Sequence, residues 1–193
     1  MTRVAAIDCG TNSIRLLVAD GHIGEDGRPH LADLTRQMRI VRLGQGVDAR
    51  GYLDPAAIER TVEATVEYQR MIEKLGATSI RFVATSATRD ASNSAEFVRQ
   101  IKAVIGVEPE VVVGTQEASL SFRGAVGGLG ESLPGPMLVV DIGGGSTELV
   151  LGSTSVKQAI SIDMGAVRVT EKFFAHVDPS GGVPAEDQAR AIA

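Results

Sequence analysis

The chain has 193 residues, which is enough for one sizeable domain or two small ones. With 44% hydrophobic residues, 22% charged residues and no Trp, the composition is typical of a globular protein with an aliphatic core. The formal net charge of −5 argues against a protein that coats nucleic acid, but leaves an anionic substrate open, because a basic cleft can lie on an acidic molecule.

One cysteine excludes an intramolecular disulfide and indicates a reducing compartment. The chain opens directly into a strand pattern without a signal-type leader, and no apolar run is long enough to span a bilayer. We therefore expect a cytoplasmic protein with neither a membrane nor a nucleic-acid partner.

Three strands open the chain, and their short connections favour antiparallel pairing. They are predicted at 4–9, 14–20 and 31–43. The third carries three arginines at a spacing of three, so these do not share one face. A solvated edge and a polyanion-facing role are equally open for them; they are Arg36, Arg39 and Arg42.

The clearest helix is predicted over 55–75. Asp54 can cap it, Pro55 suits its first position and Gly76 ends it. A strand, a helix, a strand and a short helix follow in that order, at 80–84, 94–105, 110–113 and 116–124. Three antiparallel strands followed by this alternation are the order of the ribonuclease H-like fold, whose duplicated form underlies actin, sugar kinases and heat-shock chaperones.

A second copy of the pattern begins after a stretch rich in Gly and Pro, predicted as a linker over 127–136. Its predicted elements are strands at 137–142, 147–152 and 156–162, a helix at 166–176 and a helix from Ala185 onward. We expect an α/β protein with a mixed five-stranded sheet flanked by helices. Its predicted domains are 1–126 and 137–193, the second being an incomplete copy of the first.

A six-residue motif occurs at the same place in each copy. Residues 8–13 read DCGTNS and residues 141–146 read DIGGGS, each between two apolar runs. Asp, Gly and Ser keep their positions, which predicts a strand, a tight turn and a returning strand. One such turn is ordinarily only a hairpin. Two matched copies, one with three glycines, favour backbone that approaches a phosphate, with the two tips facing each other across a cleft.

The sequence resembles the amino-terminal part of the exopolyphosphatase and guanosine pentaphosphate phosphohydrolase (Ppx/GppA) family over essentially the whole chain. The first and last of the segments that carry this resemblance occur throughout the actin-like ATPase superfamily, and the middle three are more specific. The segments are 5–18, 42–46, 84–90, 114–118 and 140–149.

The resemblance implies that Glu117 is the catalytic residue. A carboxylate here can orient a water molecule and accept its proton during attack on the terminal phosphorus. Without the resemblance, an acid in the first turn of a helix is explained by the helix dipole. The family often has a second acid just before this Glu, where this chain has Gln116.

The resemblance also implies a Mg²⁺ site at Asp141 and Glu148, with Asp8 contributing from the opposite lip. Hard carboxylate oxygens suit Mg²⁺, which keeps waters and bridges to phosphate oxygens. The alternative for Glu148 is a strand residue that faces solvent. Another eight residues are implied in phosphate binding, namely Thr11, Asn12, Ser13, Arg89, Gly143, Gly144, Gly145 and Ser146, with Arg89 in a loop of small residues.

For some polar residues the sequence indicates a functional role less strongly. The side chain of Arg15 is expected to face either the cleft or the solvent-exposed side of the sheet. Cys9 is expected to be a small buried residue rather than a catalytic thiol, because no His is near it in sequence. The three histidines form no metal-ligand pair and favour surface roles; they are His22, His30 and His176.

The expected function is an exopolyphosphatase that removes the terminal phosphate of inorganic polyphosphate by direct attack of water. Guanosine pentaphosphate is the alternative substrate, since both need the same phosphate machinery. An actin-like kinase or ATPase would need an adenosine site. A non-catalytic polyphosphate-binding module is the alternative from another class, and a homodimer is open.

Overall fold

The computed structural model describes residues 2–25, 27, 29–127, 135–178 and 180–192. The chain divides into two compact units, residues 1–112 and 113–193, and each is described by itself. The described part contains no helix with the length and apolar character needed to cross a membrane.

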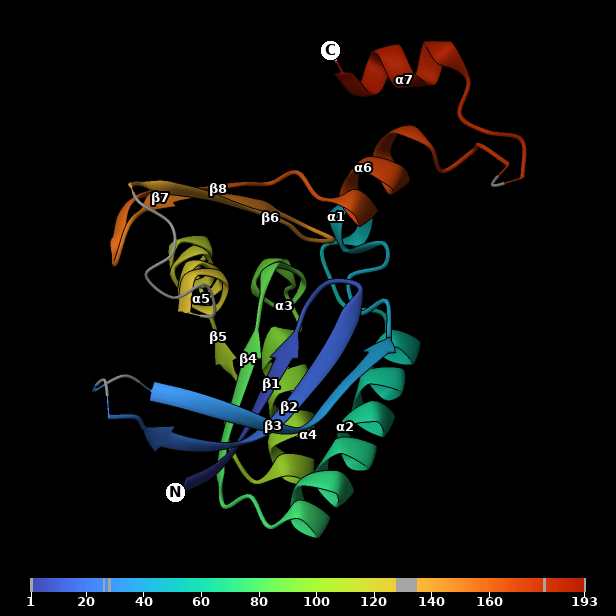
Figure 1. The fold of residues 1–193 in the computed structure, drawn as a ribbon. Coiled ribbons are helices and arrows are strands. Elements are labelled where there is room, and N and C mark those ends of the chain that lie inside the picture. The colour runs from blue at the N-terminus through green and yellow to red at the C-terminus, as the bar shows by residue number, and fades with distance from the viewer. Residues whose placement is uncertain (1, 26, 28, 128–134, 179, 193) are drawn as a thin grey trace. The chain divides into compact units, whose positions relative to one another are not determined.

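The first unit is built on a mixed sheet of five strands in the order β3-β2-β1-β4-β5 (Figure 1). The first three strands are antiparallel neighbours, and β4 and β5 add on in parallel. This order confirms the fold class that the sequence predicts. The strands are β1 (Thr2–Cys9), β2 (Ser13–Ile23), β3 (Pro29–Ile40), β4 (Ser79–Ala84) and β5 (Glu110–Val111).

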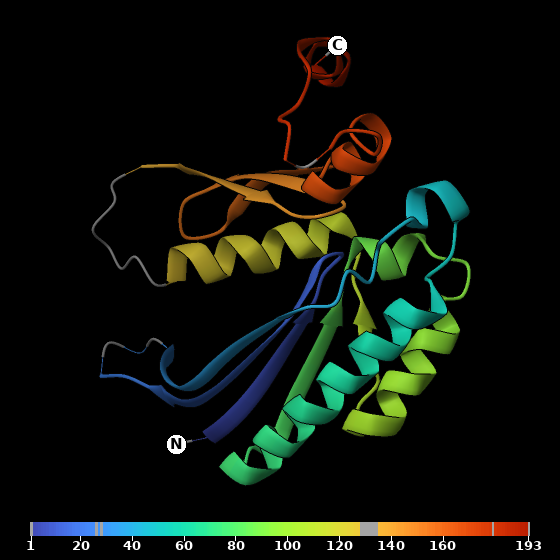
Figure 2. The same ribbon diagram turned by 90° about the vertical axis from the view of Figure 1, so that its right-hand side faces the viewer.

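Two long helices cover one face of this sheet and pack against each other (Figure 2). They are α2 (Pro55–Leu75) and α4 (Ser94–Ile105). Asp54 caps α2 by accepting a hydrogen bond of 2.9 Å from the Ala56 N–H, and Gly76 ends it in the left-handed conformation. The buried core between sheet and helices includes Ala5, Ile7, Cys9, Leu16, Val18, Tyr68, Ile72, Phe97 and Ile101.

Tyr68 fastens α2 to the sheet. Its hydroxyl donates a buried hydrogen bond of 3.0 Å to the carbonyl of Ile14 in β2. We expect Tyr68→Phe to lower the free energy of unfolding by about 1–2 kcal/mol, because the buried carbonyl loses its partner. Denaturant titration measures this change. Tyr52→Phe is the control, since the Tyr52 side chain is exposed, and an effect as large there would contradict the assignment.

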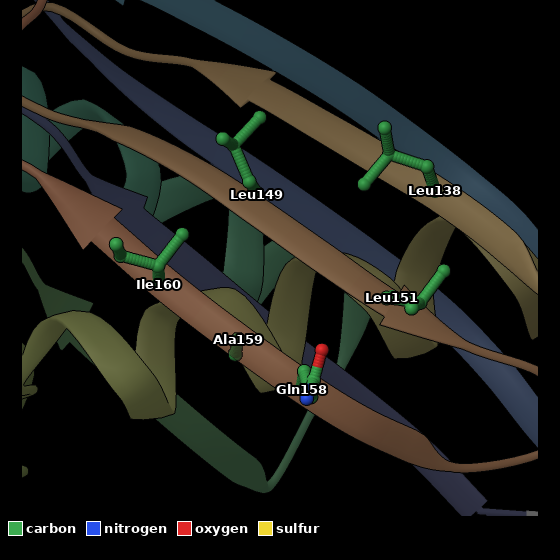
Figure 3. Close-up of a pocket in the computed structure, with 6 residues that line it drawn as sticks. All are labelled: Leu138, Leu149, Leu151, Gln158, Ala159 and Ile160. Atoms are coloured by element: carbon green, nitrogen blue, oxygen red, sulfur yellow. The ribbon is translucent and has the colours of Figure 1, made fainter.

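The second unit contains a three-stranded antiparallel sheet in the order β6-β7-β8. Helix α5 (Gly114–Gly127) runs along one face of this sheet (Figure 2). On the other face, leucine and isoleucine side chains stand out from the three strands (Figure 3). Its buried Ala118 and Phe122 pack against Val150. The other elements are β6 (Met137–Ile142), β7 (Thr147–Gly152), β8 (Val156–Ile162), α6 (Ala166–Phe173) and α7 (Ala185–Ile192).

The structure places helix α5 differently from the sequence prediction. The prediction assigns this helix to the first domain, whereas it contacts all three strands of the second sheet, so the units divide after Val112 rather than after 126. Most of the predicted linker, residues 128–134, lies outside the described residues. The helix predicted at 166–176 ends at Phe173.

Two short helices were missed by the sequence prediction. They are α1 (Val47–Arg50) and α3 (Ser86–Asp90), of four and five residues. Elements this short do not complete the apolar periodicity by which a helix is recognised.

Candidate active site

The repeated motif forms the same turn in both units. In the first unit the Gly10 N–H donates to the Ser13 carbonyl at 2.9 Å, and in the second the Gly143 N–H donates to the Ser146 carbonyl at 2.9 Å. The register then sets the first Asp of each motif opposite the polar residue of the returning strand. The pairs are Asp8 with Arg15 and Asp141 with Glu148.

The first hairpin tip is fixed to its own unit by backbone and side-chain contacts. The Thr11 carbonyl accepts from the Gly44 N–H at 2.8 Å, and the Thr11 and Ser86 hydroxyls lie 2.9 Å apart. A Cβ on Gly44 would lie 2.3 Å from the Thr11 methyl carbon, so only glycine fits there. Thr11 is therefore buried, while Asn12 is exposed and available to a ligand.

Arg89 lies near this tip, in the short helix α3 rather than in the predicted loop. Helix α3 begins where β1 ends, since the Thr85 N–H donates to the Cys9 carbonyl at 3.2 Å. The Arg89 Nη1 donates to the Val112 carbonyl at 3.1 Å. The first unit thus gathers Arg89, the hairpin tip and Asp8 at one end of its sheet.

The carboxylate pair of the second unit is held by two serines. The Ser121 hydroxyl of α5 donates to Asp141 at 2.7 Å, and the Ser161 hydroxyl of β8 donates to Glu148 at 2.7 Å. Glu148 is only 1% exposed, so the alternative that it faces solvent is wrong. Sequence reasoning missed both serines, because contacts between residues so far apart in the chain leave no local pattern.

Helix α5 presents Glu117 on the same face as these contacts. Gly114, Glu117 and Ser121 follow one another at helical spacings of three and four. A Cβ on Gly114 would lie 2.5 Å from the Cβ and Oγ of Ser161, so the helix start packs directly on the residue that holds Glu148. Glu117 therefore lies between the two points at which α5 contacts the carboxylate pair and its partners. These points are Ser121, which binds Asp141, and Gly114, which packs on Ser161.

This packing predicts opposite effects for two glycines of one helix. Gly114→Ala is expected to lower the unfolding midpoint by a few degrees, because the added methyl must displace Ser161. Gly124→Ala is expected to be neutral or stabilising by up to about 1 kcal/mol, since nothing lies within 4 Å of its Cβ position and Ala favours helix. Thermal unfolding of both variants measures the contrast, and equal effects would contradict it.

The Gly-rich turn of the second unit is tied to the start of helix α6. The Gly143 carbonyl accepts from the Ala166 N–H at 2.9 Å, and the Gly144 carbonyl accepts from Val167 at 2.9 Å and Arg168 at 3.1 Å. Within the described ranges, no hydrogen bond is formed by the N–H of Gly144. The same holds for Gly145, so both N–H groups suit an anionic ligand.

The donor set of the pair fits a hard divalent cation. Asp141 and Glu148 offer carboxylate oxygens from one cross-strand position, and the nearly complete burial of Glu148 makes a compensating cation favourable. No group of three His, Cys, Asp or Glu side chains suited to a metal occurs in the described part of the chain. The pair would thus leave coordination positions to water and phosphate.

The other polar candidates take structural or surface roles. Arg36 pairs with Asp33 at 2.7 Å, which supports the solvated-edge interpretation for that arginine. Arg39 pairs with Glu67 at 3.4 Å in the same manner. Arg42 lies beyond the end of β3 at a φ of 51°, and its N–H donates to the Asn12 carbonyl at 2.9 Å.

Cys9 is 1% exposed, which confirms the expected burial of this cysteine, and burial raises the pKa of its thiol. His22 and His30 are cross-strand neighbours whose rings stack with centroids 5.6 Å apart. His176 lies 3.1 Å from Asp187. Neither contact involves the carboxylate pair.

Comparisons with known proteins identify relatives of the chain. Exopolyphosphatase 2 of Mycobacterium tuberculosis is 52% identical over 184 residues, which cover 93% of this chain and 57% of that protein. The crystal structure of an exopolyphosphatase-like protein matches with a TM-score of 0.89 at 42% identity and covers 99% of this chain and 58% of that one. An exopolyphosphatase from Cytophaga hutchinsonii matches with a TM-score of 0.84 at 29% identity, over 98% of this chain and 58% of that one.

The chain therefore spans less than three fifths of the length of these relatives. The model of the Ppx/GppA phosphatase family matches residues 22–186, which is most of the chain. Together with the fold and the repeated hairpin, these matches establish that the chain belongs to the Ppx/GppA phosphatase family.

Proposed function

We propose that the chain carries the catalytic machinery of a phosphoanhydride hydrolase that releases orthophosphate from the end of inorganic polyphosphate. The observation that carries the proposal is that Glu117 lies on the same face of α5 as Ser121 and Gly114. Ser121 binds Asp141, and Gly114 packs on Ser161, which binds Glu148. Relatives named exopolyphosphatases support the substrate class. The cytoplasm, as a reducing compartment, is the location that fits the single thiol.

Glu117 is the proposed base. A carboxylate in this position orients a water molecule and takes its proton as the water attacks phosphorus. The N–H groups of Gly144 and Gly145 would stabilise the charge that spreads over the equatorial phosphate oxygens. Ser146 would add its hydroxyl. The mechanism uses no nucleophilic side chain, so the phosphoryl group passes directly to water.

Asp141 and Glu148 are the proposed ligands of Mg²⁺, with Asp8 as a further contributor. The bound cation would neutralise negative charge on the phosphate oxygens. Ser121 and Ser161 fix the orientation of the two carboxylates through their hydrogen bonds of 2.7 Å. In the first unit, Asn12, Ser13 and Arg89 are proposed to bind phosphates of the substrate, whereas the buried Thr11, predicted from the sequence to bind phosphate, holds the hairpin tip in place through Ser86.

The polyphosphate assignment is tested against guanosine pentaphosphate. Orthophosphate release is measured with Mg²⁺ from long polyphosphate and from guanosine pentaphosphate in parallel. We expect faster release from polyphosphate, because repeated phosphates present the same geometry at each step and need no base-recognition pocket. Faster release from the nucleotide would assign the chain to the other branch of the family.

A polyphosphate-binding module without turnover is the second candidate. The same experiment separates the two functions. Labelled polyphosphate that binds, without orthophosphate release at high protein concentration, would support the binding module and overturn the hydrolase for this chain.

A further inference from the structure

The loop that follows strand β3 carries one exposed arginine. Strand β3 ends at Ile40, and the side chains of the next residues alternate between buried and exposed. Val41 and Leu43 are buried in the core of the first unit, and Arg42 between them is exposed. The two apolar neighbours therefore hold the loop against the core, while the guanidinium of Arg42 extends into solvent.

This loop is bound to the tip of the first hairpin. The N–H groups of Val41 and Arg42 both donate to the carbonyl of Asn12, at 3.0 and 2.9 Å. The Gly44 N–H donates to the carbonyl of Thr11 at 2.8 Å, so the loop follows the tip over two successive residues. Asn12 is exposed, as Arg42 is. Because the two main chains are in contact and arginine has a long side chain, a phosphate bound at Asn12 lies within reach of the Arg42 guanidinium.

The backbone of Arg42 is held in the left-handed conformation. Its φ of 51° is the only positive φ at a non-glycine residue in the described part of the chain, and Gly46 of the same loop also has a positive φ. A residue with a Cβ is strained in this conformation, and strained residues gather at sites that bind ligands. Glycine would adopt the conformation without strain, so the fold alone does not account for an arginine at this position.

The charge of Arg42 also differs in its surroundings from the charges of the two arginines in β3. Arg36 pairs with Asp33 at 2.7 Å. Arg39 pairs with Glu67 at 3.4 Å. Over the residues that the structure describes, the side chain of Arg42 forms neither a hydrogen bond nor an ion pair. Its charge therefore remains available to a ligand, and the planar fork of N–H groups matches the oxygens of a phosphate.

We propose that Arg42 is a further substrate-binding residue whose guanidinium contacts a phosphate of polyphosphate beside Asn12, an assignment that rests on the proposed function. A guanidinium stays protonated, so it supplies charge and hydrogen bonds and takes no part in proton transfer. The loss of Arg42 should therefore weaken the binding of polyphosphate. It should not weaken the fold, because the backbone contacts to Asn12 do not use the side chain.

The test measures the dissociation constant of labelled long polyphosphate, with Mg²⁺, for the unchanged chain and two variants. Arg42→Gln removes the charge and should raise the Kd about tenfold. Arg42→Gly removes the charge and the strain together, so its Kd should rise equally while its unfolding midpoint stays the same or rises by a few degrees. In both variants the slope of log Kd against log salt concentration should become shallower by about one, since one contact between a cation and a phosphate is lost.

Arg70→Gln is the matched control, because it removes the same charge from an exposed arginine of the same unit. Arg70 lies near the end of α2, where the carbonyl of Leu75 accepts a hydrogen bond from Arg3 at the start of β1, and therefore at the end of the sheet away from the hairpin tip. The control should leave both the Kd and the salt slope unchanged.

Three results would overturn the role of Arg42 and leave the proposed function standing. The first is an Arg42→Gln variant that binds polyphosphate as tightly as the unchanged chain. The second is an equal loss of binding in Arg70→Gln, which would indicate a general effect of net charge. The third is an Arg42→Gly variant whose midpoint falls by several degrees, which would indicate a structural role. An unchanged chain that binds no polyphosphate would instead overturn the proposed function, and the role of Arg42 with it.

Discussion

Replacing Glu117 by Gln is expected to lower the turnover of polyphosphate by about 10²–10⁴-fold, which is the usual contribution of a positioned general base. Gln keeps the size of the side chain and its place in the first turn of α5, but it cannot accept a proton from water. Orthophosphate release at saturating substrate measures the effect. Polyphosphate binding should change far less, because the lost group acts on the attacking water.

Glu96→Gln is the control for this experiment. Glu96 is also a first-turn acid, at the start of α4 in the other unit, and its substitution should leave turnover within about twofold. A Glu117→Gln variant that keeps most of its activity would contradict the catalytic role. Glu117 would then only stabilise the helix by interacting with its dipole.

Replacing Glu148 by Gln is expected to remove the stabilisation that the proposed Mg²⁺ site gives to the fold. A ligand that binds the folded state raises the unfolding midpoint, so the unchanged chain should become more stable as Mg²⁺ is added. The variant keeps an oxygen that accepts the hydrogen bond from Ser161 and loses the buried negative charge. Its affinity for Mg²⁺ should fall by roughly 100-fold or more.

Without the metal, the variant should be as stable as the unchanged chain or slightly more stable, because burying an uncompensated charge costs free energy. Thermal unfolding over a Mg²⁺ titration measures both effects. Glu186→Gln, at an exposed carboxylate of the same unit, should keep the full response. A Glu148→Gln variant whose midpoint still rises with Mg²⁺ would place the cation elsewhere.

The regular elements could be predicted because their signals are local. The cap at Asp54 and the stop at Gly76 define α2, and the structure has it at the predicted residues. The repeated Asp, Gly and Ser fix the turn of each hairpin, and the turn sets the register that pairs Asp141 with Glu148. The part of the site within one hairpin could thus be read from the sequence.

The remaining parts depend on tertiary packing. Whether α5 covers the first or the second sheet is decided by which side chains Ala118 and Phe122 meet, and the helical pattern itself does not say. Ser121 and Ser161 acquire their roles only when a helix and a third strand lie against the hairpin. Gly114 looks like a helix-start glycine in sequence, while the structure shows that it permits close approach to Ser161.

The central claim is that Glu117 and Glu148 belong to one catalytic unit. A double-mutant cycle of Glu117→Gln and Glu148→Gln tests it through the rate of orthophosphate release. Residues that act as a unit are strongly non-additive, so the double variant should be hardly slower than the slower single variant. If instead the two losses multiply, the residues act independently and the account of a single site on α5 and the β6–β7 hairpin is contradicted.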